Sequence, residues 1–342
     1  MRTRLLTIAA LLLTTRMGYA QAPPSQPAQP TARSPFQGTV DFGGLFTTTD
    51  GDEARYERYR DTRDGVYSNL SVNRNTSSSV FNAHALHPGY RDQRYDATLL
   101  TKRVNVLFDW VSVPLNYSYI VSTPFATNGS TLTLDNNAQQ AVQGPTNATN
   151  DGTAVGIPCA PGAPPAACGN ATQVAQALTN RSIYNALASP FELRHVRDTA
   201  NVGLNFAATR AIDVDANFRS SARDGQQPWG ASFAFNTAVE LPQPIDQRTN
   251  DLSVGASWSN PRGMFRLGWD GSWFNNNFQS LTWDNPIRIS DFDNGLLPPN
   301  GPYDPNGYSN GNGPAQGRES VAPSNTMNVV SCLLYTSDAA DE

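Results

Sequence analysis

Hydrophobic and polar residues alternate strictly along several segments of the chain. From Ala200 to Ala208 the even positions are apolar, whereas the odd positions are mostly Asn and Gly. The same period of two recurs at 212–218, 252–258 and 265–273, with Asp, Arg and Ser on the polar side. A period of two predicts β-strands with two unlike faces. Lengths of about 8–11 residues suit tilted strands that cross a membrane.

The connections between these strands are very unequal in length. Short turns are predicted at 209–211, at 259–263 and around Pro114, the last joining strands at 104–110 and 115–121. Long loops are predicted at 122–195, 219–250 and 274–328. Short turns on one side and long loops on the other are typical of outer-membrane barrels. Compact soluble domains rarely keep several loops of this length.

Large aromatic residues lie at or near the predicted strand ends, namely Trp258, Trp269, Trp273, Phe274 and Phe278. Alternation alone fits a soluble β-sandwich as well as a barrel, but an aromatic girdle at the strand ends favours a membrane barrel. The predicted fold is therefore all-β: a large antiparallel transmembrane β-barrel with short periplasmic turns and long extracellular loops, incomplete in this chain.

The first 35 residues are predicted to lie outside the barrel. Residues 1–20 fit a secretory signal, with Arg2 and Arg4 before an apolar stretch and a cleavage site between Ala20 and Gln21. Residues 21–35 are rich in proline and are predicted to form an extended periplasmic tether. The partial barrel is predicted to occupy residues 36–330.

The last twelve residues, 331–342, show neither the alternation nor the Asn/Gly loop chemistry of the preceding chain. The string SCLLYTSDAADE resembles a translated sequencing adapter of the kind that ends metagenomic gene fragments. We therefore expect residues 331–342 to be a non-native tail and the chain to be the N-terminal part of a longer barrel. A genuine acidic C-terminal tail is the alternative.

Composition excludes several classes of protein. Charged residues make up only 15% of the chain, against roughly 25% in a typical soluble domain. No run of about 18 apolar residues exists, which excludes an α-helical membrane span. The net charge of −5 and the lack of a basic stripe argue against a nucleic-acid partner.

The cysteines give one positive and one negative prediction. Cys159 and Cys168 are the two cysteines before the tail, and an oxidising exported compartment predicts a disulfide between them, with two free thiols as the alternative. The chain has no Cys-x-x-Cys-His motif, so no c-type haem attaches to it. We therefore expect this chain to bind no cofactor of its own.

No catalytic or metal-binding residues are predicted. The chain lacks the serine-hydrolase, zinc-protease, P-loop and dinucleotide fingerprints, so an enzyme is not expected. Asp50-Gly51-Asp52-Glu53, with Asp61 and Asp64, could offer oxygens to Ca²⁺ but lacks the EF-hand spacing. Interleaved arginines favour a solvated, ion-paired turn instead.

Several motifs, in order along residues 36–330, resemble one known family. They are Thr39-Val40-Asp41-Phe42-Gly43-Gly44, Asp50-Gly51-Asp52, Arg55-Tyr56, Tyr59-Arg60-Asp61-Thr62-Arg63-Asp64-Gly65, Gly89-Tyr90-Arg91-Asp92-Gln93-Arg94-Tyr95, Trp283-Asp284-Asn285-Pro286 and Gly301-Pro302-Tyr303-Asp304-Pro305-Asn306-Gly307-Tyr308. Together they resemble the decahaem-associated outer-membrane barrels of the MtrB/PioB family. None of these motifs is a catalytic signature.

The resemblance implies a barrel in the bacterial outer membrane that holds and insulates a periplasmic multihaem c-type cytochrome. The haems would carry electrons across the membrane, and the barrel would contact lipid on its outside. The Cys-x-x-Cys pair that the best-known members carry near the mature N-terminus is missing here, which leaves the electron donor open. Residues 291–318 could dock an extracellular cytochrome or be only a solvated loop. A diffusion porin and a secreted β-sandwich adhesin are the alternative functions.

Overall fold

The computed structural model describes residues 36–142, 182–234, 237–286, 308–309 and 313–336. The predicted signal, the cleavage site at Ala20 and Gln21, the tether and the pair Cys159 and Cys168 all lie outside the described residues. Those assignments stay predictions.

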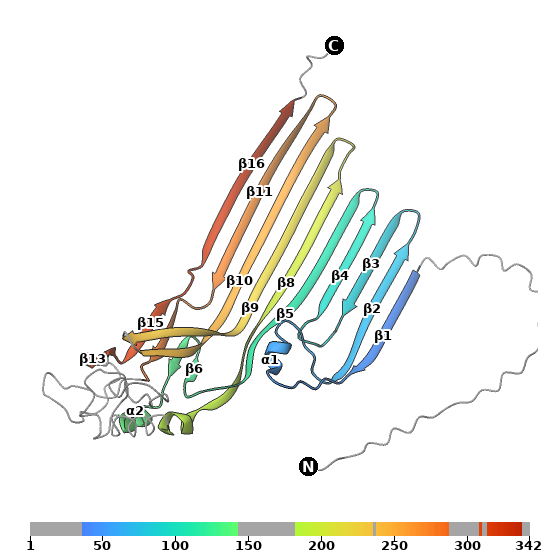
Figure 1. Ribbon diagram of the computed structural model, residues 1–342. Helices are drawn as coiled ribbons and strands as arrows, with labels where there is room; N and C mark the ends of the chain where they lie inside the picture. The colour runs from blue at the N-terminus through green and yellow to red at the C-terminus, as the bar shows by residue number, and fades with distance from the viewer. Residues whose placement is uncertain (1–35, 143–181, 235–236, 287–307, 310–312, 337–342) are drawn as a thin grey trace, which may run out of the picture. The chain divides into compact units, whose positions relative to one another are not determined.

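Ten strands of the described chain form one antiparallel sheet in the order β1-β2-β3-β4-β5-β8-β9-β10-β11-β16. Their bounds are β1 Phe36–Leu45, β2 Gly65–Asn75, β3 Ser79–Leu86, β4 Arg94–Thr101, β5 Val104–Thr123, β8 Ser189–Ala207, β9 Ile212–Ala234, β10 Thr237–Asn260, β11 Gly263–Asn276 and β16 Asn325–Thr336. Neighbours in the sheet follow chain order, as in an up-and-down meander (Figure 1). The sheet is open, because β1 and β16 are its edges.

The short turns lie together at one end of the sheet (Figure 1). Four tight hairpins are each closed by a side-chain oxygen that accepts hydrogen bonds from backbone N–H groups of the turn. The accepting side chains are those of Thr76, Thr101, Thr209 and Asn260. For example, Asn260 Oδ1 accepts from the N–H groups of Arg262 and Gly263 at 2.8 and 3.0 Å. Thr and Asn favour turns through such local hydrogen bonds. The predicted turns at 209–211 and 259–263 are confirmed.

The predicted turn at Pro114 is wrong, because β5 continues through it as a single strand of 20 residues. β4 accompanies β5 only as far as Val111, and beyond this point β5 pairs with β8 alone. The flanking N–H groups of Ser112 and Asn116 donate away from β8, to Gln93 and Arg58. Pro114 lies midway between these two residues, so its backbone nitrogen also points away from β8. Its missing N–H therefore removes no bond from the β5–β8 ladder, and a strand tolerates proline at such an edge.

The predicted long loop at 219–250 is also wrong. β9 has 23 residues and β10 has 24. The two strands stay paired along their length, from the Ile212–Trp258 pair beside the short turns to the Ala234–Thr237 pair at the far end. Pro228 and Pro242 are Cα partners, so the two prolines interrupt the ladder at one position rather than two. The two strands therefore extend well beyond the alternating segments.

A second, small sheet lies at the end of the main sheet that carries the long connections (Figure 1). Its order is β15-β12-β7-β6, with bounds β6 Ala126–Asn128, β7 Thr131–Thr133, β12 Ser280–Asp284 and β15 Gln316–Ser320. The remaining elements are α1 Glu53–Tyr56, α2 Asn136–Val142, β13 Tyr308–Ser309 and β14 Gly313–Pro314. The predicted loops at 122–195 and 274–328 therefore contain regular structure.

The hydrophobic core of the described chain lies in this region, and we call it the loop core. It comprises Phe125, Leu132, Leu134, Leu241, Leu281 and Trp283, with Tyr184, Trp229 and Ala231 packed against it. Its members come from both long connections and from the outer part of the β9–β10 hairpin. Three segments far apart in the sequence thus share one core.

At the other end of the chain, β16 extends six residues past the predicted barrel limit of 330. Residues 331–336 pair with 263–268 of β11 in continuous register. The non-native origin of residues 331–342 stays a prediction.

Candidate functional site

The apolar side of the main sheet is continuous across its central strands. The strand register places the alternating apolar side chains of β5, β8, β9, β10 and β11 on one side of the sheet, and we call this surface the apolar band. Its members are Val104, Val106, Phe108, Trp110, Ala200, Val202, Leu204, Phe206, Ile212, Val214, Ala216, Phe218, Leu252, Val254, Ala256, Trp258, Phe265, Leu267, Trp269 and Trp273. Many of its large residues are exposed, including Phe206, Ile212 and Trp258. A charge-free apolar surface of this kind suits contact with lipid.

Aromatic residues mark both limits of the apolar band. Trp258 and Phe265 are partners beside the short turns. At the other limit, Tyr95 pairs with Trp110, with ring centroids 5.4 Å apart, and Trp273 lies at the same level of the sheet. Trp269 is an exception to the predicted girdle, because it lies in the middle of β11. Beyond the outer limit, Asp198, Asp224 and Arg248 occupy the same side, so the membrane-facing segment ends there.

The opposite side of the sheet is polar. One cross-strand row on this side, which we call the polar row, runs through Ser71, His84, Asp96, Asp109, Asn201, Arg219, Asp251 and Ser272. Several of its members are joined directly: His84 to Asp96 at 2.8 Å, Asn201 to Asp109 at 3.3 Å, and Ser272 to Asp251 at 2.6 Å. The polar row therefore contains three hydrogen-bonded pairs, each between neighbouring strands.

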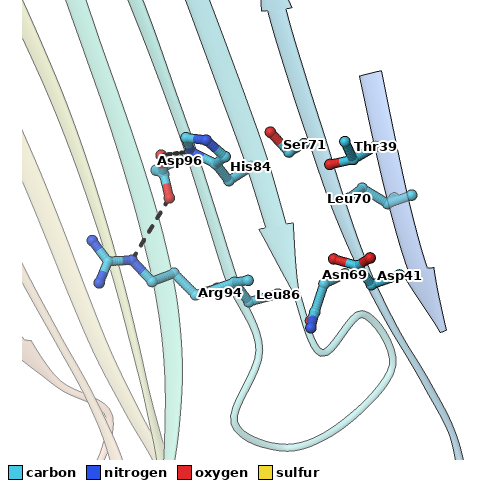
Figure 2. Close-up of a pocket in the computed structure, with 9 residues that line it drawn as sticks. All are labelled: Thr39, Asp41, Asn69, Leu70, Ser71, His84, Leu86, Arg94 and Asp96. Carbon is cyan, nitrogen blue, oxygen red and sulfur yellow. Dashed lines mark hydrogen bonds and ion pairs between the residues drawn. The ribbon is translucent and has the colours of Figure 1, made fainter. Parts of the chain in front are cut away.

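Figure 2 shows the part of this surface that lies on β1–β4. A pocket there is lined by Thr39, Asp41, Asn69, Leu70, Ser71, His84, Leu86, Arg94 and Asp96. Asp96 lies between His84 and Arg94, and the guanidinium of Arg94 also reaches Asp109 at 3.0 Å. The acids of the pocket are thus partly neutralised by its own basic side chains.

An ion pair on the polar side connects strands that are not neighbours. Arg266 of β11 binds both carboxylate oxygens of Asp215 of β9, at 2.7 and 2.9 Å. The pair crosses β10 at Gly255, where an added Cβ would lie 2.5 Å from Arg266 Nη2 and 3.0 Å from Asp215 Oδ1. Gly255 is therefore required for this bidentate contact. The sequence placed all three residues on the polar side but gave no sign of their pairing.

The acidic turn after β1 has structural roles. The side chain of Asp52 accepts from Arg55 N–H at the start of α1, Asp64 accepts from Thr47 N–H, and Asp61 accepts from Arg91 N–H. In the described residues no group of three or more His, Cys, Asp or Glu side chains is arranged to hold a metal ion. The carboxylates of this turn fix the loop backbone instead.

Glu57 anchors the same loop to the outer part of β5. Its carboxylate accepts from Thr62 N–H and from Tyr119 Oη, the latter at 2.7 Å, while its carbonyl accepts from Asn116 Nδ2. Burial alone would raise the pKa of Glu57, but these hydrogen bonds and the nearby Arg91 lower it below its ordinary value. Burial and the bond to Glu57 raise the pKa of Tyr119 well above its usual range. The ionised carboxylate of Glu57 and the neutral phenol of Tyr119 therefore hold the loop on the outer part of β5.

Trp283-Asp284-Asn285-Pro286 joins the long connections. Trp283 is buried in the loop core, Asp284 accepts from Leu134 N–H at 2.7 Å and from Gln316 Nε2 at 2.9 Å, and Asn285 N–H donates to the carbonyl of Ala315. These contacts span up to 150 residues of sequence. The motif therefore organises the far end of the sheet.

The two faces and the unequal connections define a class of protein. No helix in the described chain is both long and apolar enough to cross a membrane. An antiparallel meander with an apolar, aromatic-edged outer side and a polar inner side is the wall of an outer-membrane β-barrel. Residues 48–327 match the model of a family described as "Putative outer membrane beta-barrel porin, MtrB/PioB", and the chain belongs to that family.

This membership confirms the predicted family, fold class and outer-membrane location, and it favours a barrel over the secreted β-sandwich. The family is of the porin type and is not a family of enzymes. A search of curated proteins found no match.

Proposed function

We propose that the chain is the wall of an outer-membrane barrel that holds and insulates a multihaem c-type cytochrome, through which electrons cross the membrane. The observation that carries this proposal is the match to the MtrB/PioB family over residues 48–327. Residues 1–20 would direct the chain across the inner membrane before the barrel is inserted.

The polar side of the sheet supports a polar guest rather than an empty, uniformly charged pore. Acidic side chains (Asp41, Asp96, Asp109, Asp213, Asp215, Asp251 and Asp270) outnumber the basic Arg94, Arg197, Arg219, Arg223 and Arg266 there. Many of these groups are already joined in pairs, so they form a fixed pattern of donors and acceptors. Such a pattern can orient a protein surface through electrostatic complementarity.

The apolar band would supply the insulation. Its charge-free side chains face the low-dielectric bilayer, where an electron carrier exposed to lipid would lack any polar support. The sequence has no Cys-x-x-Cys-His motif, so every haem in the assembly would come from the partner. The roles of this chain are therefore to enclose, position and separate the cytochrome from lipid.

Affinity purification of the full chain from outer membranes tests this proposal. The chain should bring down a haem-staining protein in a constant ratio, and the complex should survive detergent extraction. The matched control is the same preparation from cells that lack the multihaem cytochrome. Membranes that contain the chain and the cytochrome but never yield them together would contradict the proposal.

A diffusion porin is the second candidate, and the family description favours it directly. A lumen lined with Asp, Asn and Ser would also conduct hydrated solutes. Planar-bilayer recordings distinguish the two functions. A porin gives large steady conductance in its native state, whereas a barrel occupied by a cytochrome conducts only after the cytochrome is removed.

A further inference from the structure

A basic cluster lies on the polar side of β8 and β9, beyond the outer limit of the apolar band. It consists of His195, Arg197 and Arg223, and we call it the arginine cluster. Arg197 and Arg223 are direct Cα partners, and His195 pairs with Gly225 in the next position on the same side. His195 is five residues beyond Ala200, so the cluster lies outside the membrane-spanning part of the strands.

The two arginines face each other on the polar side, whereas the acidic residues that follow them in the chain, Asp198 and Asp224, lie on the opposite side of the sheet. Like charges directly opposite each other on one face of a sheet are destabilising. Neither arginine forms an ion pair with a carboxylate in the described part of the chain. The side-chain contacts of Arg223 Nη2 are with His195 Nε2 at 3.5 Å and Gln227 Oε1 at 3.4 Å. The arrangement therefore has an unbalanced positive charge.

The cluster also contains buried donors without acceptors. His195 is only 3% exposed, and burial together with Arg223 and Arg197 lowers its pKa to about 4, so the ring is neutral near pH 7. Because Nε2 faces an Arg223 N–H and acts as acceptor, the ring proton belongs on Nδ1. Nδ1 of His195 and Nε of Arg223 are both buried and have no partner. A buried donor without an acceptor is destabilising, because it has lost its hydrogen bonds to water and gained none in the protein.

Neighbouring residues close the cluster around these donors. The ring of Tyr117 lies 5.9 Å from that of His195, and the guanidinium of Arg58 lies 5.7 Å from the Tyr117 ring. Gly225 has a φ of 127°, and an added Cβ there would lie 2.5 Å from the carbonyl oxygen of Arg194 and 2.7 Å from His195 Cα. The close approach of β9 to His195 therefore requires glycine at this position.

We propose that the arginine cluster is a binding site for an oxyanion, either a phosphate or a carboxylate group. An oxyanion would accept from the guanidinium groups of Arg197 and Arg223 and would balance their opposed charges. Guanidinium groups match both anions with paired, charge-assisted hydrogen bonds. The neutral His195 can contribute an N–H without adding a third positive charge. The site belongs to this chain alone and does not depend on a cytochrome.

Isothermal titration of the full chain in detergent micelles tests the site, with inorganic phosphate in one series and succinate in the other. We expect saturable binding of at least one anion, weakened at least about tenfold by Arg223→Gln because a charge-assisted contact is lost. Arg219→Gln is the matched control: it removes the same charge from the same face of β9, but Arg219 lies opposite Asn201 and Asp251. The control should bind as the unmodified chain does.

Comparison of the two titrations identifies the source of the anion. Preference for phosphate indicates a free or lipid-borne phosphate, and preference for succinate indicates a carboxylate supplied by a partner; either result, lost in Arg223→Gln, supports the site. Arg197→Gln is a second variant at an exposed position, in case Arg223→Gln does not fold. Absence of binding by the unmodified chain, or equal binding by the variants, would overturn the proposal.

Discussion

Adjacent residues of β9 have opposite surroundings, and this gives the sharpest test of the two faces. Val214 lies in the apolar band between Phe206 and Ala256, whereas Asp215 pairs with Arg266 on the polar side. Val214→Arg should reduce the free energy of unfolding by about 2–4 kcal/mol if the site is near the bilayer midplane. Asp215→Asn should cost less than about 1 kcal/mol, because the ion pair is partly exposed. Urea titration of the chain folded into lipid vesicles measures both, and the reverse order would mean that the faces are inverted.

Gly255 tests the ion pair that crosses β10. A larger side chain at this position would collide with Arg266 and Asp215, so Gly255→Val should break their contact. Most of the cost should disappear when the variant is made in an Asp215→Asn, Arg266→Gln background, where no ion pair remains to be broken. A double-mutant cycle in the vesicle assay measures this coupling. Equal costs in the two backgrounds would show that Gly255 has another role.

His195 predicts a particular dependence of stability on pH. Its pKa is about 4 in the folded chain, against 6.5 as the ordinary value, because of burial, Arg223 and Arg197. The unfolded chain binds the proton first as the pH falls, so stability should decrease between about pH 6.5 and pH 4. Arg223 and Arg197 are the charged groups that act on the ring, the Tyr117 ring packs beside it, and Arg58 lies over that Tyr117 ring. His195→Gln should flatten this part of the profile, and a profile of unchanged slope would contradict the assignment.

The loop core is the element whose stability can be separated from that of the strands. Trp283 is buried among leucines supplied by three distant segments. Trp283→Ala should cost about 3–5 kcal/mol locally and expose the long connections to protease, while the strands stay protected. Trp258→Ala, at an exposed position of the apolar band, is the control and should leave the protease pattern unchanged. Limited proteolysis with mass mapping measures the difference.

Periodic alternation predicted the strands well at the scale of single elements. The segments at 200–208, 212–218, 252–258 and 265–273 form strands as predicted. A strand between lipid and a polar interior must present apolar and polar side chains in turn, and this requirement is visible in the sequence. The sequence was less informative where this constraint ends. Beyond the apolar band, β9 and β10 continue without a lipid-facing pattern, and Pro114 lies in β5 only because β4 has already ended.

The site was predicted only in part, for a related physical reason. Alternation places Asp213, Asp215 and Arg266 on polar faces, but register decides which of them meet. The Asp215–Arg266 pair joins residues 51 positions apart, and Arg197 meets Arg223 through the β8–β9 register. The role of Trp283-Asp284-Asn285-Pro286 also depends on contacts with residues about 150 positions earlier. The glycines at 255 and 225 were the available signals, since each lies where two other groups need the space.

At the scale of the whole molecule, the chain divides polar and apolar chemistry between two sides of one sheet. Alongside the apolar band the charged residues lie on the polar side, where arginines partly balance the carboxylates of Asp109, Asp213, Asp215, Asp251 and Asp270. The low overall charge follows from this division, because the apolar band carries none. A molecule built in this way can enclose a polar guest in a membrane.

The most direct test of this function is crosslinking from the two faces of a single strand in native outer membranes. A photoreactive residue replaces Asp251 on the polar side of β10 in one variant and Val254 in the apolar band in the other. We predict a haem-staining crosslinked product from position 251 and none from position 254. Haem-staining product from 254 alone, or from neither position in membranes that contain the cytochrome, would contradict the proposal that this sheet encloses a multihaem partner.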